Sequence, residues 1–177
     1  SDMTTIPMGQ GISCTALQLT VAISAIANGG ELMKPFIVKS ILDASSNTVR
    51  TFNPVVIRRV ISEETASKMR QILRGVVTSG TGRRARIKGY GVCGKTGTAQ
   101  KVSMKGGYEK GKYIASFAGF APLDNPRVSL VVCVDEPKGS YFGGTVSAPA
   151  FKRMMQKILK YMEVPEYHEE TESSAKI

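Results

Sequence analysis

Three segments of the chain show the spacing of apolar residues that predicts a helix. Residues 15–28 are apolar almost all round, which is typical of a helix enclosed in a core. Thr15 or Ser13 can cap its start, and two glycines after Asn28 would end it. Residues 62–77 begin with a serine and two glutamates and then place apolar side chains on one stripe. A third helix, capped by Ser147, repeats apolar residues on one face as far as Met162.

The other periodic segments predict strands connected by short turns. Residues 36–52 indicate a hairpin around a turn at 43–47, and three further strands are predicted at 90–102, 112–121 and 128–134. The connections between these three strands are short enough for antiparallel pairing. The last strand is a continuous apolar run, so we expect it to lie in the centre of the sheet. The predicted fold class is therefore α+β, an antiparallel sheet packed by helices.

The length and composition fit one globular domain. The chain has 177 residues, of which 42% are hydrophobic and 21% are charged, and a domain usually takes about 100–200 residues. No apolar run approaches the roughly 20 residues that cross a membrane, and the first residues do not form a signal peptide. We therefore expect one domain over residues 1–163 without its own membrane span, followed by a flexible acidic tail at 164–177.

The counts of histidine and cysteine exclude several kinds of site. The single histidine, His168, lies in the acidic tail, so a nucleophile activated by a rigidly held histidine is not expected. The three cysteines, Cys14, Cys93 and Cys133, are widely spaced and have no histidine partners. This spacing favours neither a zinc site nor a disulfide framework, and we expect all three to be small buried hydrophobic residues.

Positive charge is concentrated in one part of the sequence. Residues 58–112 contain 14 lysines or arginines and three glutamates, so they carry +11, against +10 for the whole chain. Such a stretch indicates an anionic partner: nucleic acid, an acidic membrane surface or a carboxylated substrate. It is equally typical of a solvated surface. A nucleic-acid-binding module is a weak alternative, because the tyrosines are scattered and no groove-reading helix is predicted, so we expect no specific nucleic acid partner.

One glycine-rich segment matches two unrelated kinds of site. Residues 89–96 satisfy the phosphate-loop pattern that ends Gly-Lys-Thr, and Asp135 follows an apolar strand as a magnesium ligand does in many ATPases. A phosphate loop, however, needs a buried strand before it and a helix after it. The preceding residues are too charged for that strand, and the following ones begin a helix poorly. A nucleotide hydrolase therefore remains the less favoured alternative.

The other interpretation of this segment keeps Lys95, Thr96, Gly97 and Thr98 on a strand. An edge strand can pair with an extended peptide, and a glycine without a side chain lets that peptide approach closely. The lysine and the threonine hydroxyls offer positive charge and hydrogen-bond donors to a terminal carboxylate. An ordinary strand with a surface lysine would show the same pattern.

Motifs in a fixed order along the chain decide between these interpretations. The chain resembles the C-terminal half of the transpeptidase domain of a division-type class B penicillin-binding protein, a peptidoglycan D,D-transpeptidase. The motifs that carry the resemblance are Met8-Gly-Gln-Gly-Ile12, Thr15-Ala-Leu-Gln18, Ala25-Ile-Ala-Asn-Gly-Gly30, Arg59-Val-Ile-Ser-Glu-Glu64, Ser79-Gly-Thr-Gly82, Lys95-Thr-Gly-Thr-Ala-Gln100, Ile114-Ala-Ser-Phe-Ala-Gly-Phe-Ala-Pro122, Asp135-Glu-Pro137 and Tyr141-Phe-Gly-Gly144.

The resemblance implies a fold of the penicillin-binding protein and β-lactamase type. It implies a serine acyltransferase that cross-links peptidoglycan stem peptides and is acylated by β-lactams. Lys95 and Thr98 are implied as catalytic residues. Lys95 would supply positive charge and a proton-relay contact, and the backbone N–H of Thr98 would be one of two donors to the oxyanion.

The resemblance also implies the substrate-binding residues. The hydroxyls of Thr96 and Thr98 would hold the carboxylate of the stem peptide or drug, and Gly97 would lie beside them. Tyr141 and Gly143 would line the mouth of the cleft. Neither a metal nor an organic cofactor is implied.

The family also needs a Ser-x-x-Lys motif and a Ser-x-Asn motif, and both precede the region that matches here. Matches at 173–176 and 45–47 are interpreted as accidents, because one falls in the predicted tail and the other in a predicted turn. The chain is therefore expected to be inactive alone. The parent protein would be held by an N-terminal membrane helix on the extracytoplasmic side of the membrane, where other division or wall-synthesis proteins would be its partners.

Overall fold

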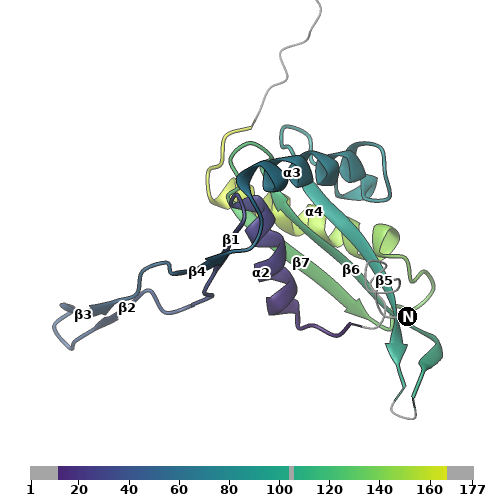
Figure 1. Cartoon of the computed structure of the whole chain (residues 1–177), viewed down its shortest axis with the longest axis horizontal. Helices are drawn as coiled ribbons and strands as arrows, with labels where there is room; N and C mark the ends of the chain where they lie inside the picture. Colours follow the sequence, from purple (N-terminus) through teal and green to yellow (C-terminus); the bar gives the residue numbers. More distant parts are fainter. Residues whose placement is uncertain (1–11, 104–105, 167–177) are drawn as a thin grey trace, which may run out of the picture.

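The computed structural model describes residues 12–103 and 106–166, in which helices pack on both faces of an antiparallel sheet. Among the described residues this sheet has three strands in the order β5-β6-β7. Helix α4 packs on one face, α2 packs on the other, and α3 lies along β5 (Figure 1). The elements in chain order are α2 (Ala16–Ala27), β1 (Glu31–Met33), β2 (Ser40–Leu42), β3 (Thr48–Thr51), β4 (Val56–Arg59), α3 (Glu63–Thr78), the 3₁₀ helix η2 (Arg83–Ala85), β5 (Cys93–Val102), β6 (Tyr108–Ala121), β7 (Val128–Asp135) and α4 (Gly143–Tyr161).

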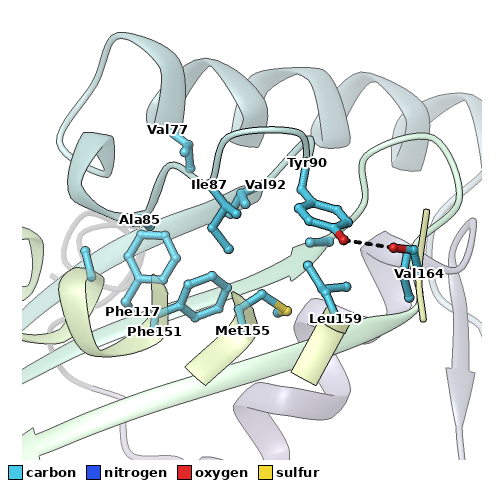
Figure 2. Close-up of a cluster of buried hydrophobic side chains, with 12 residues drawn as sticks. Val77, Ala85, Ile87, Tyr90, Val92, Phe117, Phe151, Met155, Leu159 and Val164 are labelled. Atoms are coloured by element: carbon cyan, nitrogen blue, oxygen red, sulfur yellow. Dashed lines mark hydrogen bonds between the residues drawn. The ribbon is translucent and has the colours of Figure 1, made fainter. Parts of the chain in front are cut away.

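The face of the sheet beneath α4 carries the larger hydrophobic core. Phe117 of β6 packs against Phe151 of α4 with ring centroids 4.6 Å apart, and Met155 and Leu159 are fully buried one and two turns further along α4 (Figure 2). Full burial of such a side chain stabilises a fold by about 1.5–3 kcal/mol. A smaller cluster on the opposite face joins Phe120 to α2 and α3.

The start signals of the first two helices are confirmed, but that of the third is wrong. Thr15 and Gln18 form a capping box at α2, and the Ser62 hydroxyl accepts from Thr65 N–H at α3. Helix α4 instead begins at Gly143, one turn before the predicted cap at Ser147. Ser147 is fully buried inside the helix, and its hydroxyl donates to the Ala115 carbonyl of β6 at 2.9 Å. Its polar group therefore connects helix and sheet and does not cap the helix.

The position of the apolar strand differs from the prediction. Among the described strands, β6 and not β7 is central, since β6 pairs with both neighbours and β7 with β6 alone. The apolar run of β7 is explained by its two faces, because α2 contacts β7 on one side and α4 contacts it on the other. A strand that is covered on both faces has a continuously apolar sequence, whether it is central or at an edge of the sheet.

The segment between α2 and α3 forms an arm of paired strands. Strands β2 and β3 form the predicted hairpin, and β1 pairs with β4 at the base of the arm, which was not predicted. Figure 1 shows the arm extending away from the β5–β7 sheet. In residues 12–103 and 106–166, no helix has both the length and the apolar character needed to cross a membrane.

The start of the predicted tail belongs to the core. Val164 is buried in the cluster beneath α4, and its carbonyl accepts a hydrogen bond of 2.8 Å from the Tyr90 hydroxyl (Figure 2). The residues after 166 that the sequence analysis assigned to the tail lie outside the described residues.

Replacing Tyr90 by Phe should lower the free energy of unfolding by about 0.5–1.5 kcal/mol, the usual contribution of one hydrogen bond. The substitution removes only the hydroxyl that holds Val164. Urea denaturation would measure the change, with Tyr108→Phe as the control because Tyr108 is exposed on β6. Equal stabilities for the two variants would show that the contact between Tyr90 and Val164 contributes nothing.

Candidate functional site

Strand β5 presents the Lys-Thr-Gly-Thr residues at the edge of the sheet. Lys95 pairs with Ala118 and Thr98 with Ala115 of β6, and the other edge of β5 has no partner strand in the part of the chain that the structure describes. Side chains alternate along a strand. Thr96 and Thr98 therefore share the α4 face of the sheet, and Lys95 lies on the opposite face.

The start of α4 packs directly on the backbone of β5. The Gly143 N–H donates to the Thr98 hydroxyl at 3.1 Å. A Cβ atom added to Gly143 would lie 2.4 Å from the Gly97 carbonyl and 2.3 Å from the Ser116 carbonyl. Contacts this short do not occur between real Cβ atoms and backbone. Only glycine fits at Gly143, and the close approach fixes the position of the Thr98 hydroxyl.

A cavity of about 390 Å³ lies beside the two threonines. The Thr96 hydroxyl is 2.9 Å from the Thr81 hydroxyl, which brings the loop after α3 against β5. Arg83 and Arg84 of η2 line the same cavity as Thr96 and Thr98. The site therefore combines hydroxyl donors with two guanidinium groups, an arrangement suited to a carboxylate.

Lys95 lies outside this cavity. Its side chain is exposed, and its Nζ donates to the Thr96 carbonyl at 3.0 Å. It makes no ion pair within the described residues. The charge of Lys95 is thus not neutralised by a neighbouring carboxylate and can act on a group that binds over its face of β5.

An aromatic ridge extends from Tyr113 within β6 to Phe142 at the start of α4. The Tyr141 ring stacks on Tyr113 with centroids 4.1 Å apart and planes 12° from parallel, and it also contacts Phe142 at 4.5 Å. Phe142 lines the cavity beside Thr98. The ridge places Tyr141 and Gly143 near the threonines, and it adds Tyr113, a residue that the sequence analysis did not identify.

The geometry contradicts the phosphate-loop alternative. Gly94, Lys95 and Thr96 lie inside an antiparallel strand, not in a loop before a helix. Asp135, the candidate magnesium ligand, forms an ion pair with Lys101 at 3.0 Å. A phosphate loop binds through backbone N–H groups at a helix N-terminus, and no helix starts between β5 and β6 among the described residues.

The two other serine motifs are not brought to β5. Residues 45–47 form the turn of the arm, where N–H groups of Ser45 and Asn47 donate to the Asp43 carboxylate at 2.9 and 2.8 Å. This turn lies at the far end of the arm from β5 (Figure 1). The match at 173–176 lies outside the described residues.

The expected burial of three cysteines holds for Cys93 alone, since Cys14 and Cys133 are exposed. Burial raises the pKa of the Cys93 thiol to about 12, although Arg74 and Arg70 nearby favour its thiolate. Only a thiolate is a good nucleophile. Cys93 is therefore not a substitute for the missing serine.

Cysteine labelling at pH 8 should accordingly modify two thiols in the native chain and a third only after denaturation. The exposed Cys14 and Cys133 would react with a disulfide reagent, whereas Cys93 stays protonated and covered. Absorbance of the released thiolate would count the reacted groups. In a Cys93→Ser variant the number of thiols labelled without denaturation should stay at two. A fall to one would show that Cys93 reacts in the folded chain.

The chain is similar to known proteins over most of its length. The family described as the penicillin binding protein transpeptidase domain matches residues 1–156. Stage V sporulation protein D of Bacillus subtilis (strain 168) is 46% identical over 160 residues, which are 89% of this chain and 25% of that protein. Peptidoglycan D,D-transpeptidase FtsI of Buchnera aphidicola subsp. Baizongia pistaciae (strain Bp) is 38% identical and covers 90% of this chain and 27% of that protein. The chain thus spans about a quarter of the length of these relatives.

Solved structures show the same similarity in three dimensions. Penicillin binding protein 3 of Mycobacterium tuberculosis, complexed with ampicillin, has a TM-score of 0.83 at 36% identity, with coverage of 94% of this chain and 39% of that chain. A D,D-transpeptidase domain from Eggerthella lenta has a TM-score of 0.73 at 32% identity, covering 84% and 33% of the two chains. The similarity therefore extends over the arrangement of helices and strands, well beyond the four residues of β5.

Proposed function

Because the chain belongs to the penicillin binding protein transpeptidase domain family, we propose that it forms the substrate-binding side of a peptidoglycan D,D-transpeptidase. The observation that carries the proposal is the open edge of β5, where Thr96 and Thr98 line a cavity together with Arg83 and Arg84. A stem peptide ends in a D-alanine carboxylate, and β-lactams carry a carboxylate in the corresponding place. The hydroxyls and guanidinium groups supply the donors that such a carboxylate needs.

The hydrogen bond from Gly143 gives the Thr98 hydroxyl a defined role in this proposal. Its oxygen already accepts from the Gly143 N–H, so its own proton is free to be donated to the substrate carboxylate. The peptide would extend along the edge of β5, where Gly97 allows a close approach. The backbone N–H of Thr98 would then donate to the oxyanion of the tetrahedral intermediate.

In the proposed reaction a serine hydroxyl attacks the carbonyl carbon between the last two D-alanines. The hydroxyl proton passes to a nearby base, the terminal D-alanine leaves as the amine, and an acyl-enzyme remains. An amine of a second stem peptide then attacks this ester and forms the cross-link. Lys95 would stabilise the developing negative charge and assist the proton transfer from its own face of β5.

The attacking serine is proposed to lie outside these 177 residues. The relatives are about four times as long as the matched region, which leaves ample sequence for the two other motifs. The chain alone would then bind but not react. By the same reasoning the complete protein would work on the extracytoplasmic side of the membrane, held by a membrane helix, with wall-synthesis proteins as partners.

Covalent labelling with a fluorescent penicillin tests this function. The labelled samples are the 177-residue chain and the same gene extended upstream. We expect label on the extended protein only, and prior treatment with unlabelled ampicillin should abolish it. If neither protein is labelled, the proposed function is wrong, whereas label on the short chain would place the nucleophile within it.

A further inference from the structure

A second cavity lies apart from the Lys95 face and is strongly basic. It has a volume of about 1210 Å³ and lies between the end of α3, the segment before β5 and the middle of α4. Two acidic residues, Asp124 and Glu166, also line it. Its cationic lining consists of Arg74, Arg83, Arg84, Arg86, Lys88 and Lys152. The lining therefore carries a net charge of +4 when all these groups are ionised.

These cations have no anionic partners in the part of the chain that the structure describes. Within residues 12–103 and 106–166, none of the six forms an ion pair or donates a hydrogen bond to a carboxylate. Six like charges repel one another, and the repulsion destabilises the folded chain unless an anion compensates it. The two carboxylates of the lining are too few to balance them.

Arg74 is half-buried, whereas the other five cations are exposed. Its Nη1 atom is shielded from solvent and has no hydrogen-bond partner among the described residues. A buried donor left unpaired destabilises the folded chain, and more so when it is charged. Nearly all such groups in folded proteins are paired with protein, water or a ligand. Nη1 has no accessible surface, so the guanidinium group would have to turn toward the open cavity to pair with an acceptor there.

We propose that this cavity binds a diphosphate group, either as a free anion or as the head of a larger molecule. Four of the six cations are arginines, whose planar guanidinium groups bind phosphate oxygens in pairs. A diphosphate carries enough negative charge to neutralise most of the cavity, which a single carboxylate does not. Gly89 and Gly91 line the same cavity, but the Glu166 carboxylate and the Leu123 side chain occupy the space beside them.

The diphosphate site is distinct from the carboxylate site on β5 but adjoins it. Arg83 and Arg84 line both cavities, so η2 forms the wall between them. The proposal does not depend on transpeptidase activity, because four of the six cations line this cavity and not the one on β5: Arg74, Arg86, Lys88 and Lys152. A negative labelling experiment with penicillin would leave it intact.

Isothermal titration of the full chain with inorganic pyrophosphate tests the proposal. We expect saturable binding that is about tenfold weaker in Lys152→Gln, since a charge-assisted hydrogen bond is lost. Lys157→Gln is the matched control, because Lys157 is exposed on the same helix and lies outside the cavity. Arg74→Gln should weaken pyrophosphate binding further. If Arg74→Gln does not fold, Arg74→Lys replaces it in the same titration.

Three results would overturn the proposal. They are the absence of saturable binding, equal affinity for citrate at matched ionic strength, and equal losses in Lys152→Gln and Lys157→Gln. The last result, together with binding of a single-stranded oligonucleotide, would indicate a diffuse basic surface. Titration with adenosine diphosphate distinguishes a free diphosphate anion from the diphosphate head of a larger molecule. Tighter binding of adenosine diphosphate than of pyrophosphate supports the head of a larger molecule, and weaker binding supports the free anion.

Discussion

Replacing Lys95 by Ala in the upstream-extended protein should slow acylation by penicillin about 10²–10⁴-fold, the usual contribution of a positioned acid–base group. The Lys95 ammonium group is exposed on the open strand and is not neutralised by a carboxylate. Under the proposed function, its charge would therefore act on the reacting groups. Stopped-flow fluorescence with a labelled penicillin would measure the acylation rate constant.

Lys101 offers a matched control for this experiment. It lies six residues further along the same strand, but it forms ion pairs with Asp135 at 3.0 Å and Glu136 at 2.7 Å. Exposed pairs of this kind contribute about 0–1 kcal/mol to stability. Lys101→Ala should therefore leave acylation nearly unchanged. Similar rates for wild type and Lys95→Ala would remove Lys95 from the mechanism.

The local signals of the sequence predicted most of the fold. The capping residues Thr15 and Ser62 and the apolar periodicity of α2 and α3 act within a few residues, so they can be read from the chain alone. Ser147 shows the limit of this reading. A serine before an apolar stripe is typical of a cap, but here the partner of its hydroxyl is Ala115 on a strand distant in sequence.

Local sequence signals also failed to predict where the tail begins and which strand is central. Val164 follows the last helix in a polar segment, and its burial depends on Tyr90, a residue 74 positions away. The central place of β6 likewise depends on pairing partners that no local pattern specifies. Both predictions were wrong because the structure at these places depends on interactions between residues that are distant in sequence.

Only the residues of the candidate site that belong to a family motif could be predicted from the sequence. Lys95, Thr96 and Thr98 were found because they belong to one short motif on a single strand. The contacts that shape the cavity come from other elements: Thr81 reaches Thr96 from the loop after α3, and Tyr113 stacks on Tyr141 from β6. Neither Thr81 nor Tyr113 lies in the same sequence motif as its partner, so these contacts can be recognised only in the folded structure.

Replacing Gly143 by Ala should destabilise the protein by about 1–3 kcal/mol, the usual cost of forcing a methyl group into a packed site. The added Cβ would lie 2.3 Å from the Ser116 carbonyl and 2.4 Å from that of Gly97, and backbone cannot move aside as a flexible side chain does. The start of α4 would have to shift away from β5. Urea denaturation would measure the loss.

The same shift should weaken penicillin binding, because it breaks the hydrogen bond of 3.1 Å from Gly143 to the Thr98 hydroxyl. Gly75→Ala is the control, since Gly75 lies inside α3 with nothing within 4 Å of an added Cβ. That variant should be more stable by about 0.5–1 kcal/mol, because alanine loses less conformational entropy in a helix. Equal stability changes in the two variants would mean that α4 does not press on β5, and the Thr98 hydroxyl would then lack the support that the proposed carboxylate site requires.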